Sequence, residues 1–224
     1  MPGPLDLDEL RRSLAEVADD SQAPKMASYM KDRYQFLGIK SPERRVAARA
    51  SMTAAERASS EDIIEFATSC WEQPEREFQY VASDVLGANV ARLRASDLGA
   101  IEYLITTKSW WDTVDALATK TVGGLVSSNP ELVPVMDEWI DSDNMWLART
   151  AILHQLKYGD KADADRLFRY SLARADDTEF FIRKAIGWAL RQYGRVDPDA
   201  VYSFVVQHAD EFSGLTKREA LKHR

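Results

Sequence analysis

A tryptophan and two aspartates lie close together in the segment WWDTVDALA. Trp111 and Asp115 are four residues apart, so on a helix their side chains share one face about one turn apart. Asp112 lies off that face and suits a capping role in the first turn. The Asp115 carboxylate is either solvated or put to use. A fixed carboxylate can stabilise positive charge that develops during a reaction and can orient an attacking water.

Two residues further along the chain could assist such a carboxylate. Trp188, in FIRKAIGWALRQY, either packs in the core or offers an indole face, which attracts cations. Arg149, just after Trp146, either faces a groove or bridges to a neighbouring acid. The sequence leaves both pairs of alternatives open.

Residues that bind metals or form disulfides are scarce. A single cysteine, Cys70, makes an internal disulfide impossible, and His154, His208 and His223 have no nearby cysteines at metal-ligand spacing. We interpret Cys70 as a core residue and His154 as structural rather than catalytic. We expect no metal and no cofactor.

Charge is distributed unevenly along the chain. The formal net charge of −7 argues against a nucleic-acid partner. Two basic blocks run against that average, however, and are either solvated helix faces or binding surfaces for phosphates. The first block holds Lys25, Lys31, Arg33, Lys40, Arg44, Arg45 and Arg49, and the second holds Arg149, Lys157, Lys161, Arg166, Arg169, Arg174, Arg183, Lys184, Arg191 and Arg195.

The composition is that of an ordinary globular protein. The chain has 224 residues, of which 45% are hydrophobic and 29% charged, and this length suits one domain over residues 1–224. No apolar run approaches the length of a membrane span, and the first residues lack the apolar core of a signal peptide. We therefore expect a cytoplasmic protein.

Apolar residues recur at three- and four-residue spacing throughout, which predicts an all-α fold. We expect helices to end at Gly38, Gly87, Gly159 and Gly194. The segments 109–112 and 216–219 have the form of capping boxes at helix starts.

The helices repeat. Phe78, Trp111, Trp146 and Phe181 follow one another at intervals of 33, 35 and 35 residues, with small residues after each aromatic. At the place of Asp115 the next repeats hold Thr150 and Ala185. This pattern predicts HEAT-like repeats stacked into a curved α-solenoid, whose equivalent helices line a concave basic groove suited to a long partner.

Five ordered segments resemble the AlkD family of HEAT-like alkylpurine DNA glycosylases. They are YMKDRYQFLGIKSPERR, KSWWDTVDALA, SDNMWLARTAILHQLKY, EFFIRKAIGWALRQY and LTKREALKH, and together they extend from about Met26 to His223. The resemblance implies a monofunctional, metal-free enzyme that hydrolyses the bond between deoxyribose and cationic alkylated purines, typically 3-alkyladenine and 7-alkylguanine, in double-stranded DNA.

The resemblance also assigns roles to residues. It implies Asp115 as the catalytic carboxylate, Trp111 and Trp188 as tryptophans of the catalytic cleft, and Arg149 and Tyr29 as DNA-binding groove residues. Trp110 is expected in the core. No lysine is placed for Schiff-base chemistry, so the DNA strand should stay intact.

The expected partner is DNA alone. We expect a monomer that associates with the nucleoid through DNA, with no membrane and no obligate protein partner. Two alternatives stay open: a nucleic-acid-binding protein without catalysis, and a protein-interaction scaffold, the commonest use of helical repeats.

Overall fold

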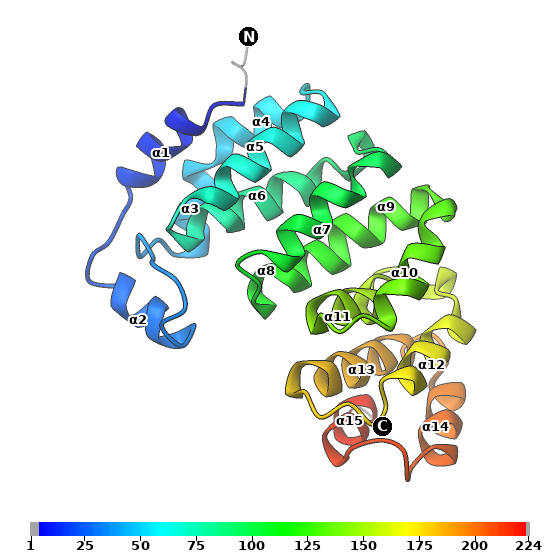
Figure 1. Cartoon of the computed structure of the whole chain (residues 1–224). Coiled ribbons are helices and arrows are strands. Elements are labelled where there is room, and N and C mark those ends of the chain that lie inside the picture. Colours follow the sequence, from blue (N-terminus) through cyan, green and yellow to red (C-terminus); the bar gives the residue numbers. More distant parts are fainter. Residues whose placement is uncertain (1–4, 223–224) are drawn as a thin grey trace. The chain divides into compact units, whose positions relative to one another are not determined.

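The computed structural model describes residues 5–222 and divides into two compact units, Met1–Leu104 and Ile105–Arg224. Both units are built from helices, as predicted, and the described residues contain no strand beyond an isolated bridge between Gln35 and Glu75 (Figure 1). No described helix has the length and apolarity that crossing a membrane requires.

In the first unit, α6 is the central helix, and α3, α4 and α5 pack against it. The α1 helix packs on α3 and α5. The helices of this unit are α1 (Leu7–Ala15), α2 (Ala23–Tyr29), α3 (Ser41–Ala47), α4 (Arg49–Ala55), α5 (Ser60–Glu72), α6 (Arg76–Ala88), the 3₁₀ turns η1 (Val90–Arg92) and η2 (Ala95–Asp97), and α7 (Leu98–Thr106), whose last two residues count to the second unit.

A buried carboxylate fixes the loop that follows α2. Glu77 is fully buried and accepts hydrogen bonds from the backbone N–H groups of Leu37, Gly38 and Ile39 at 3.0, 3.0 and 3.1 Å. Gly38 has a φ of 82°, and a Cβ there would lie 2.0 Å from the Asp19 carbonyl oxygen, so this position requires glycine.

The second unit has two layers of helices. One layer contains α8 (Trp111–Ala116) and the helical turns that continue it, followed by α11, α13 and α15, each packed on the next. The other layer contains α10, α12 and α14, which along the chain alternate with the helices of the first layer (Figure 1). This alternation confirms the predicted helical repeats. The remaining bounds are η3 (Leu117–Val122), α9 (Gly123–Ser128), η4 (Pro130–Leu132), α10 (Val133–Ile140), α11 (Met145–Leu153), η5 (Gly159–Lys161), α12 (Ala164–Ala173), α13 (Phe180–Tyr193), α14 (Pro198–Gln207) and α15 (Gly214–Ala220).

The helix that begins with α8 changes its winding after Ala116, one residue beyond Asp115. Residues Leu117–Val122 form π-helical turns before α9 continues the α-helix, and the Thr119 hydroxyl donates to the Asp115 carbonyl at 2.8 Å. Such widened turns frequently occur at functional sites. At Gly123 a Cβ would lie 2.3 Å from the His154 carbonyl oxygen, so glycine permits this helix to approach the end of α11 closely.

Several predicted helix ends are wrong. Gly87 lies inside α6, and α2 and α11 end at Tyr29 and Leu153, several residues before Gly38 and Gly159. Gly194 does follow the last residue of α13, but with a φ of −61° rather than a left-handed one. The start of α8 has no side-chain cap, because Ser109 donates instead to the Ile105 carbonyl at 2.6 Å. Ser213, not Thr216, caps α15 and accepts from the Thr216 N–H at 3.1 Å.

His154, which we interpreted as structural, is buried in the second unit and should make stability depend on pH. Burial, with a smaller contribution from the charge of Arg166, lowers the pKa of His154 to about 4. Between about pH 6.5 and 4 the unfolded chain therefore binds a proton that the folded chain does not, and stability falls as the pH falls. Between pH 7.5 and 5 this loss is about 2 kcal/mol.

Urea unfolding at these two pH values measures the effect. Between pH 7.5 and 5, the free energy of unfolding of the His154→Gln variant should fall by about 2 kcal/mol less than that of the unaltered chain. The control is His208→Gln, which removes a histidine that is only partly buried, at the end of α14, and should change the loss much less. An equal loss in the unaltered chain and the His154→Gln variant would show that His154 takes up its proton normally when folded.

Candidate active site

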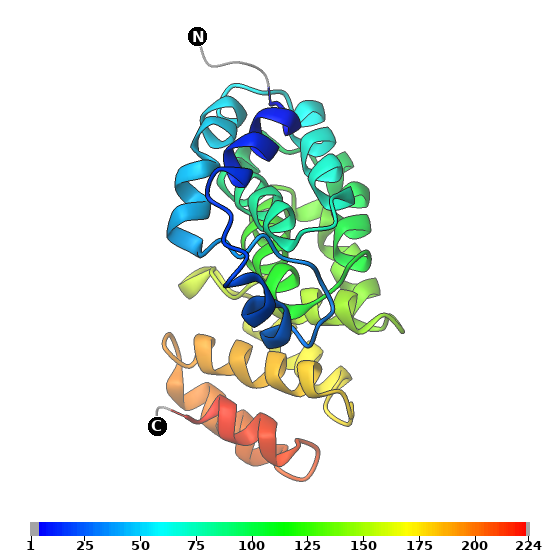
Figure 2. The same ribbon diagram turned by 90° about the vertical axis from the view of Figure 1, so that its left-hand side faces the viewer.

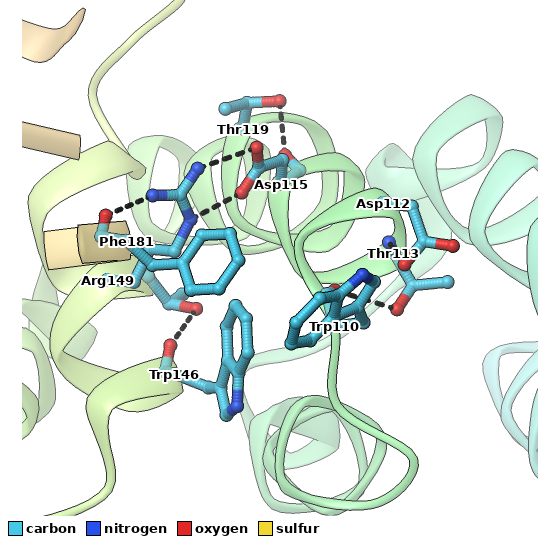
Figure 3. A network of polar contacts seen from close by, with 9 residues as sticks. Trp110, Asp112, Thr113, Asp115, Thr119, Trp146, Arg149 and Phe181 are labelled. Carbon is cyan, nitrogen blue, oxygen red and sulfur yellow. Dashed lines mark hydrogen bonds and ion pairs between the residues drawn. The ribbon is translucent and has the colours of Figure 1, made fainter. Parts of the chain in front are cut away.

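The Asp115 carboxylate and the Arg149 guanidinium form a two-point ion pair within the second unit. Arg149 Nε lies 2.7 Å from Asp115 Oδ1, and the Nη2 atom lies 2.8 Å from Oδ2 (Figure 3). The pair joins α8 to α11, two successive helices of one layer. Of the two alternatives for Arg149, a groove position or a bridge to an acid, the structure shows the bridge.

Arg149 is also fixed from its other side. Its Nη1 donates to the Phe181 carbonyl at the start of α13, and only 4% of the residue is exposed. Trp110, Trp146 and the Phe181 ring pack together beside it, with ring centroids 5.0 to 5.8 Å apart (Figure 3). The guanidinium therefore has little freedom, and it holds the carboxylate in one orientation.

Trp110, which was expected in the core, is partly exposed but packs in this aromatic cluster, where the repeat spacing had placed Trp111. Trp111 and Trp188 are both partly exposed and line one pocket together with Asp115 and Arg149. The pocket has a volume of about 280 Å³, and its remaining lining residues are Phe180, Phe181, Lys184, Arg191 and Glu219.

Four of the five predicted site residues thus meet in one pocket of the second unit. The fifth, Tyr29, is the last residue of α2 in the first unit and is 68% exposed. The structure shows an accessible tyrosine there, and its role in binding DNA stays a prediction.

The pocket contains charged residues that sequence reasoning missed. Glu219, from α15, lies 2.8 Å from Lys184 Nζ and 2.7 Å from Arg191 Nη1, both on α13. Hydrogen bonds from these two cations lower the pKa of Glu219 to about 2. The available signal was the spacing of Lys184, Trp188 and Arg191, which places all three on one helix face.

The charges of the pocket nearly cancel. Three cations and two carboxylates line it, which leaves one net positive charge. Asp115 remains reachable, since 19% of its side chain is exposed, and each of its oxygens keeps a lone pair that Arg149 does not use. The pocket can therefore present negative charge to a cation at Asp115 and positive charge to an anion at Lys184 and Arg191.

The two basic blocks differ in the structure. Most of the first block is exposed; Arg44 is buried, lies over the Tyr80 ring and approaches Asp84 at 3.5 Å. The second block is largely occupied by pairs within the chain, which include those of Arg166 with Asp163, Arg169 with Asp137, and Arg174 with Asp177. Most of its cations therefore already have a carboxylate partner within the chain.

The fold and the site together define a class of protein: an all-helical repeat protein with a fixed carboxylate in an aromatic pocket. Residues 10–223 match the family described as DNA alkylation repair enzyme, and the chain belongs to that family.

Two solved structures are similar to this chain. A predicted DNA alkylation repair enzyme from Enterococcus faecalis has 31% sequence identity and a TM-score of 0.85, over 92% of this chain and 96% of that one. The protein smu.31 from Streptococcus mutans UA159 has 15% identity and a TM-score of 0.64, over 96% of this chain and 98% of that one, and shares the fold. No curated protein matches significantly.

Proposed function

We propose that this protein is a DNA glycosylase of the AlkD type, which hydrolyses the N-glycosidic bond of cationic alkylated purines in duplex DNA. The observation that carries the proposal is the Asp115 carboxylate, oriented by Arg149 and lying in a pocket with Trp111 and Trp188. Membership of the DNA alkylation repair enzyme family supports the choice of DNA as the substrate.

The leaving base needs little help from the protein. A 3-alkyladenine or 7-alkylguanine already carries positive charge, so the purine accepts the electron pair of the breaking bond without prior protonation. The released base is then neutral. This chemistry suits a pocket whose described lining offers carboxylates and cations but no neutral group placed as a general acid.

The sugar is where the protein acts. As the bond between C1′ and the purine nitrogen breaks, positive charge develops on the deoxyribose, and Asp115 stabilises it electrostatically. Water then forms the new bond to C1′ and gives up its proton through Asp115 to the solvent. The products are the free base and an abasic site.

The tryptophans favour charged lesions. An indole face attracts a cation by roughly 0.5–2 kcal/mol, depending on how much water is excluded. Trp111 and Trp188 therefore bind the cationic base or the charged sugar better than their neutral counterparts. Arg149 serves Asp115 in this proposal, because it is buried and fully engaged.

The pocket is open to the solvent rather than shaped around one base. Phe180 at its edge is 56% exposed, and Asp115 is reachable from outside. Many enzymes that act on bases extrude the target into a closed pocket. We propose that this one approaches the lesion from the DNA backbone side, in a concave basic groove, and therefore tolerates large adducts.

Duplexes with single defined lesions test the proposal. We expect the protein to release 7-methylguanine and a bulky 7-alkylguanine at rates within about tenfold, and to leave neutral hypoxanthine in place, since neutral lesions lack the cation–π attraction. Chromatography of the released bases is the measurement. Exclusion of the bulky adduct would contradict the backbone-side approach, and binding without release of any base would assign the pocket to nucleic-acid recognition.

Lys184 lies in the same pocket and is the residue to consider for Schiff-base chemistry. Its ammonium is paired with the Glu219 carboxylate at 2.8 Å, which favours a charged group over a nucleophilic amine. The proposed enzyme is therefore monofunctional and leaves the strand uncut.

A further inference from the structure

The last helix of the described chain supplies one side chain to the pocket. The α15 helix packs so closely on α13 that a Cβ at Gly187 would lie 2.4 Å from the Glu219 Cβ. Figure 2 shows the two helices side by side, α13 in yellow-orange and α15 in red. This approach brings Glu219 to the face of α13 that carries Lys184, Trp188 and Arg191.

Glu219 holds two cations at once. Its Oε1 binds Lys184 Nζ and its Oε2 binds Arg191 Nη1, while the same Nη1 also donates to the Glu219 backbone carbonyl at 3.1 Å. Lys184 and Arg191 are seven residues apart, about two helical turns, with Trp188 between them. One carboxylate thus fixes a cation on each side of a pocket tryptophan.

The cations keep binding capacity beyond Glu219. An ammonium has three donors and a guanidinium has five, and Glu219 engages only some of them. The side chains of Lys184 and Arg191 are 37% and 20% exposed. Partly exposed ion pairs add little stability, so folding alone gives weak reason for this arrangement.

The net charge of Lys184, Arg191 and Glu219 together matches that of one phosphodiester. Two cations and one carboxylate leave a single positive charge, and a phosphodiester carries a single negative one. Arginine binds phosphate oxygens in pairs and lysine binds them as a point charge. A phosphate seated here would lie in the pocket of Asp115, beside the nucleotide that is cleaved.

We propose that Glu219 is a positioning residue that holds Lys184 and Arg191 to bind one DNA phosphate next to the altered nucleotide. This inference rests on the proposed glycosylase function. It assigns to α15 the task of completing the site, although Asp115 and both pocket tryptophans come from α8 and α13.

The variant Glu219→Gln separates positioning from folding. The substitution removes one negative charge, and it leaves the side chains of Lys184 and Arg191 without the carboxylate that holds them in place. We expect single-turnover release of 7-methylguanine to fall about tenfold, while undamaged duplex binds as tightly or more tightly at low salt. The slope of log binding constant against log salt should steepen by about 1. Loss of folding would weaken release and binding together.

Three further variants complete the test. Lys184→Gln and Arg191→Gln should each make the salt slope shallower by about 1. Asp137→Asn is the matched control, since Asp137 pairs with Arg169 at 2.8 Å elsewhere in the same unit and does not line the pocket. It should change neither release nor slope, and urea unfolding should confirm that all variants are folded.

The outcomes distinguish this inference from the function on which it rests. If the unaltered protein releases base but Glu219→Gln releases it equally fast with an unchanged slope, the positioning role is overturned and the glycosylase stands. If the unaltered protein releases no base, the proposed function fails. The salt slopes of Lys184→Gln and Arg191→Gln then still decide whether a phosphate binds there, and unchanged slopes overturn it.

Discussion

Replacing Asp115 by asparagine should slow the release of 7-methylguanine by at least about 100-fold under single-turnover conditions, which corresponds to about 2.7 kcal/mol of transition-state stabilisation. Asparagine keeps the size of the side chain and removes its charge. The positive charge that develops on the deoxyribose then lacks its counterion, and removal of one fixed electrostatic partner typically costs this much.

Asp112→Asn is the matched control for this experiment. It makes the same substitution three residues earlier on α8, where the Asp112 carboxylate accepts from the Thr113 N–H at 3.0 Å. Asp112 does not line the pocket, and release by this variant should stay within about threefold of the unaltered rate. If Asp115→Asn releases base as fast as Asp112→Asn does, Asp115 is not the catalytic carboxylate.

Replacing Arg149 by methionine should lower the free energy of unfolding by about 3 kcal/mol. The substitution leaves Asp115 without its counterion and the Phe181 carbonyl without its donor, in surroundings from which water is largely excluded. Breaking a buried pair by removing one partner is costly because the other charge stays behind. Urea unfolding measures the change.

A double-mutant cycle separates the ion pair from the packing of the arginine. The combined variant with Asp115→Asn should be less destabilised than the sum of the two single variants, by about 1–3 kcal/mol. Arg149→Lys keeps the charge but cannot bind both carboxylate oxygens, and it should fall between the unaltered chain and Arg149→Met. Strict additivity of the two substitutions would show that the pair is not coupled.

Much of the fold could be predicted because it depends on local periodicity. Apolar residues three and four apart give the helices, and the recurring aromatics give the repeat. The division into two compact units could not be predicted, since contacts between distant segments determine it. The aromatic spacing also misplaced one residue: Trp110, not Trp111, packs with Trp146 and Phe181.

Helix ends were less predictable than helices. Ser109 and Thr216 stand three residues before an acid, yet neither caps a helix, because the backbone turns into the helix at Trp110 and Ser213 instead. A cap depends on where the chain turns, and that depends on packing between helices as well as on the local sequence.

The candidate site also has one part that local spacing predicts and another that depends on packing between helices. Asp115 and Trp111 share a helix face, so their spacing predicted that they lie together. The partner of Asp115 could not be chosen from the sequence, because Arg149 meets it only when α11 packs beside α8. Glu219 lies still further away along the chain and joins the site through the packing of α15 on α13.

The products of the 7-methylguanine reaction test the central claim most directly. The unaltered protein should be incubated with the lesion duplex in water enriched in ¹⁸O, and base and strand should be analysed by mass. Hydrolysis at C1′ predicts intact, unlabelled 7-methylguanine, an abasic strand that carries the label at C1′ at the moment of cleavage, and an unbroken backbone. Trapping the abasic aldehyde with hydride soon after mixing limits later exchange of its oxygen with the labelled water, so that the label reports the hydrolysis step. Guanine restored in the strand, or a lesion left bound and unchanged, would contradict the account.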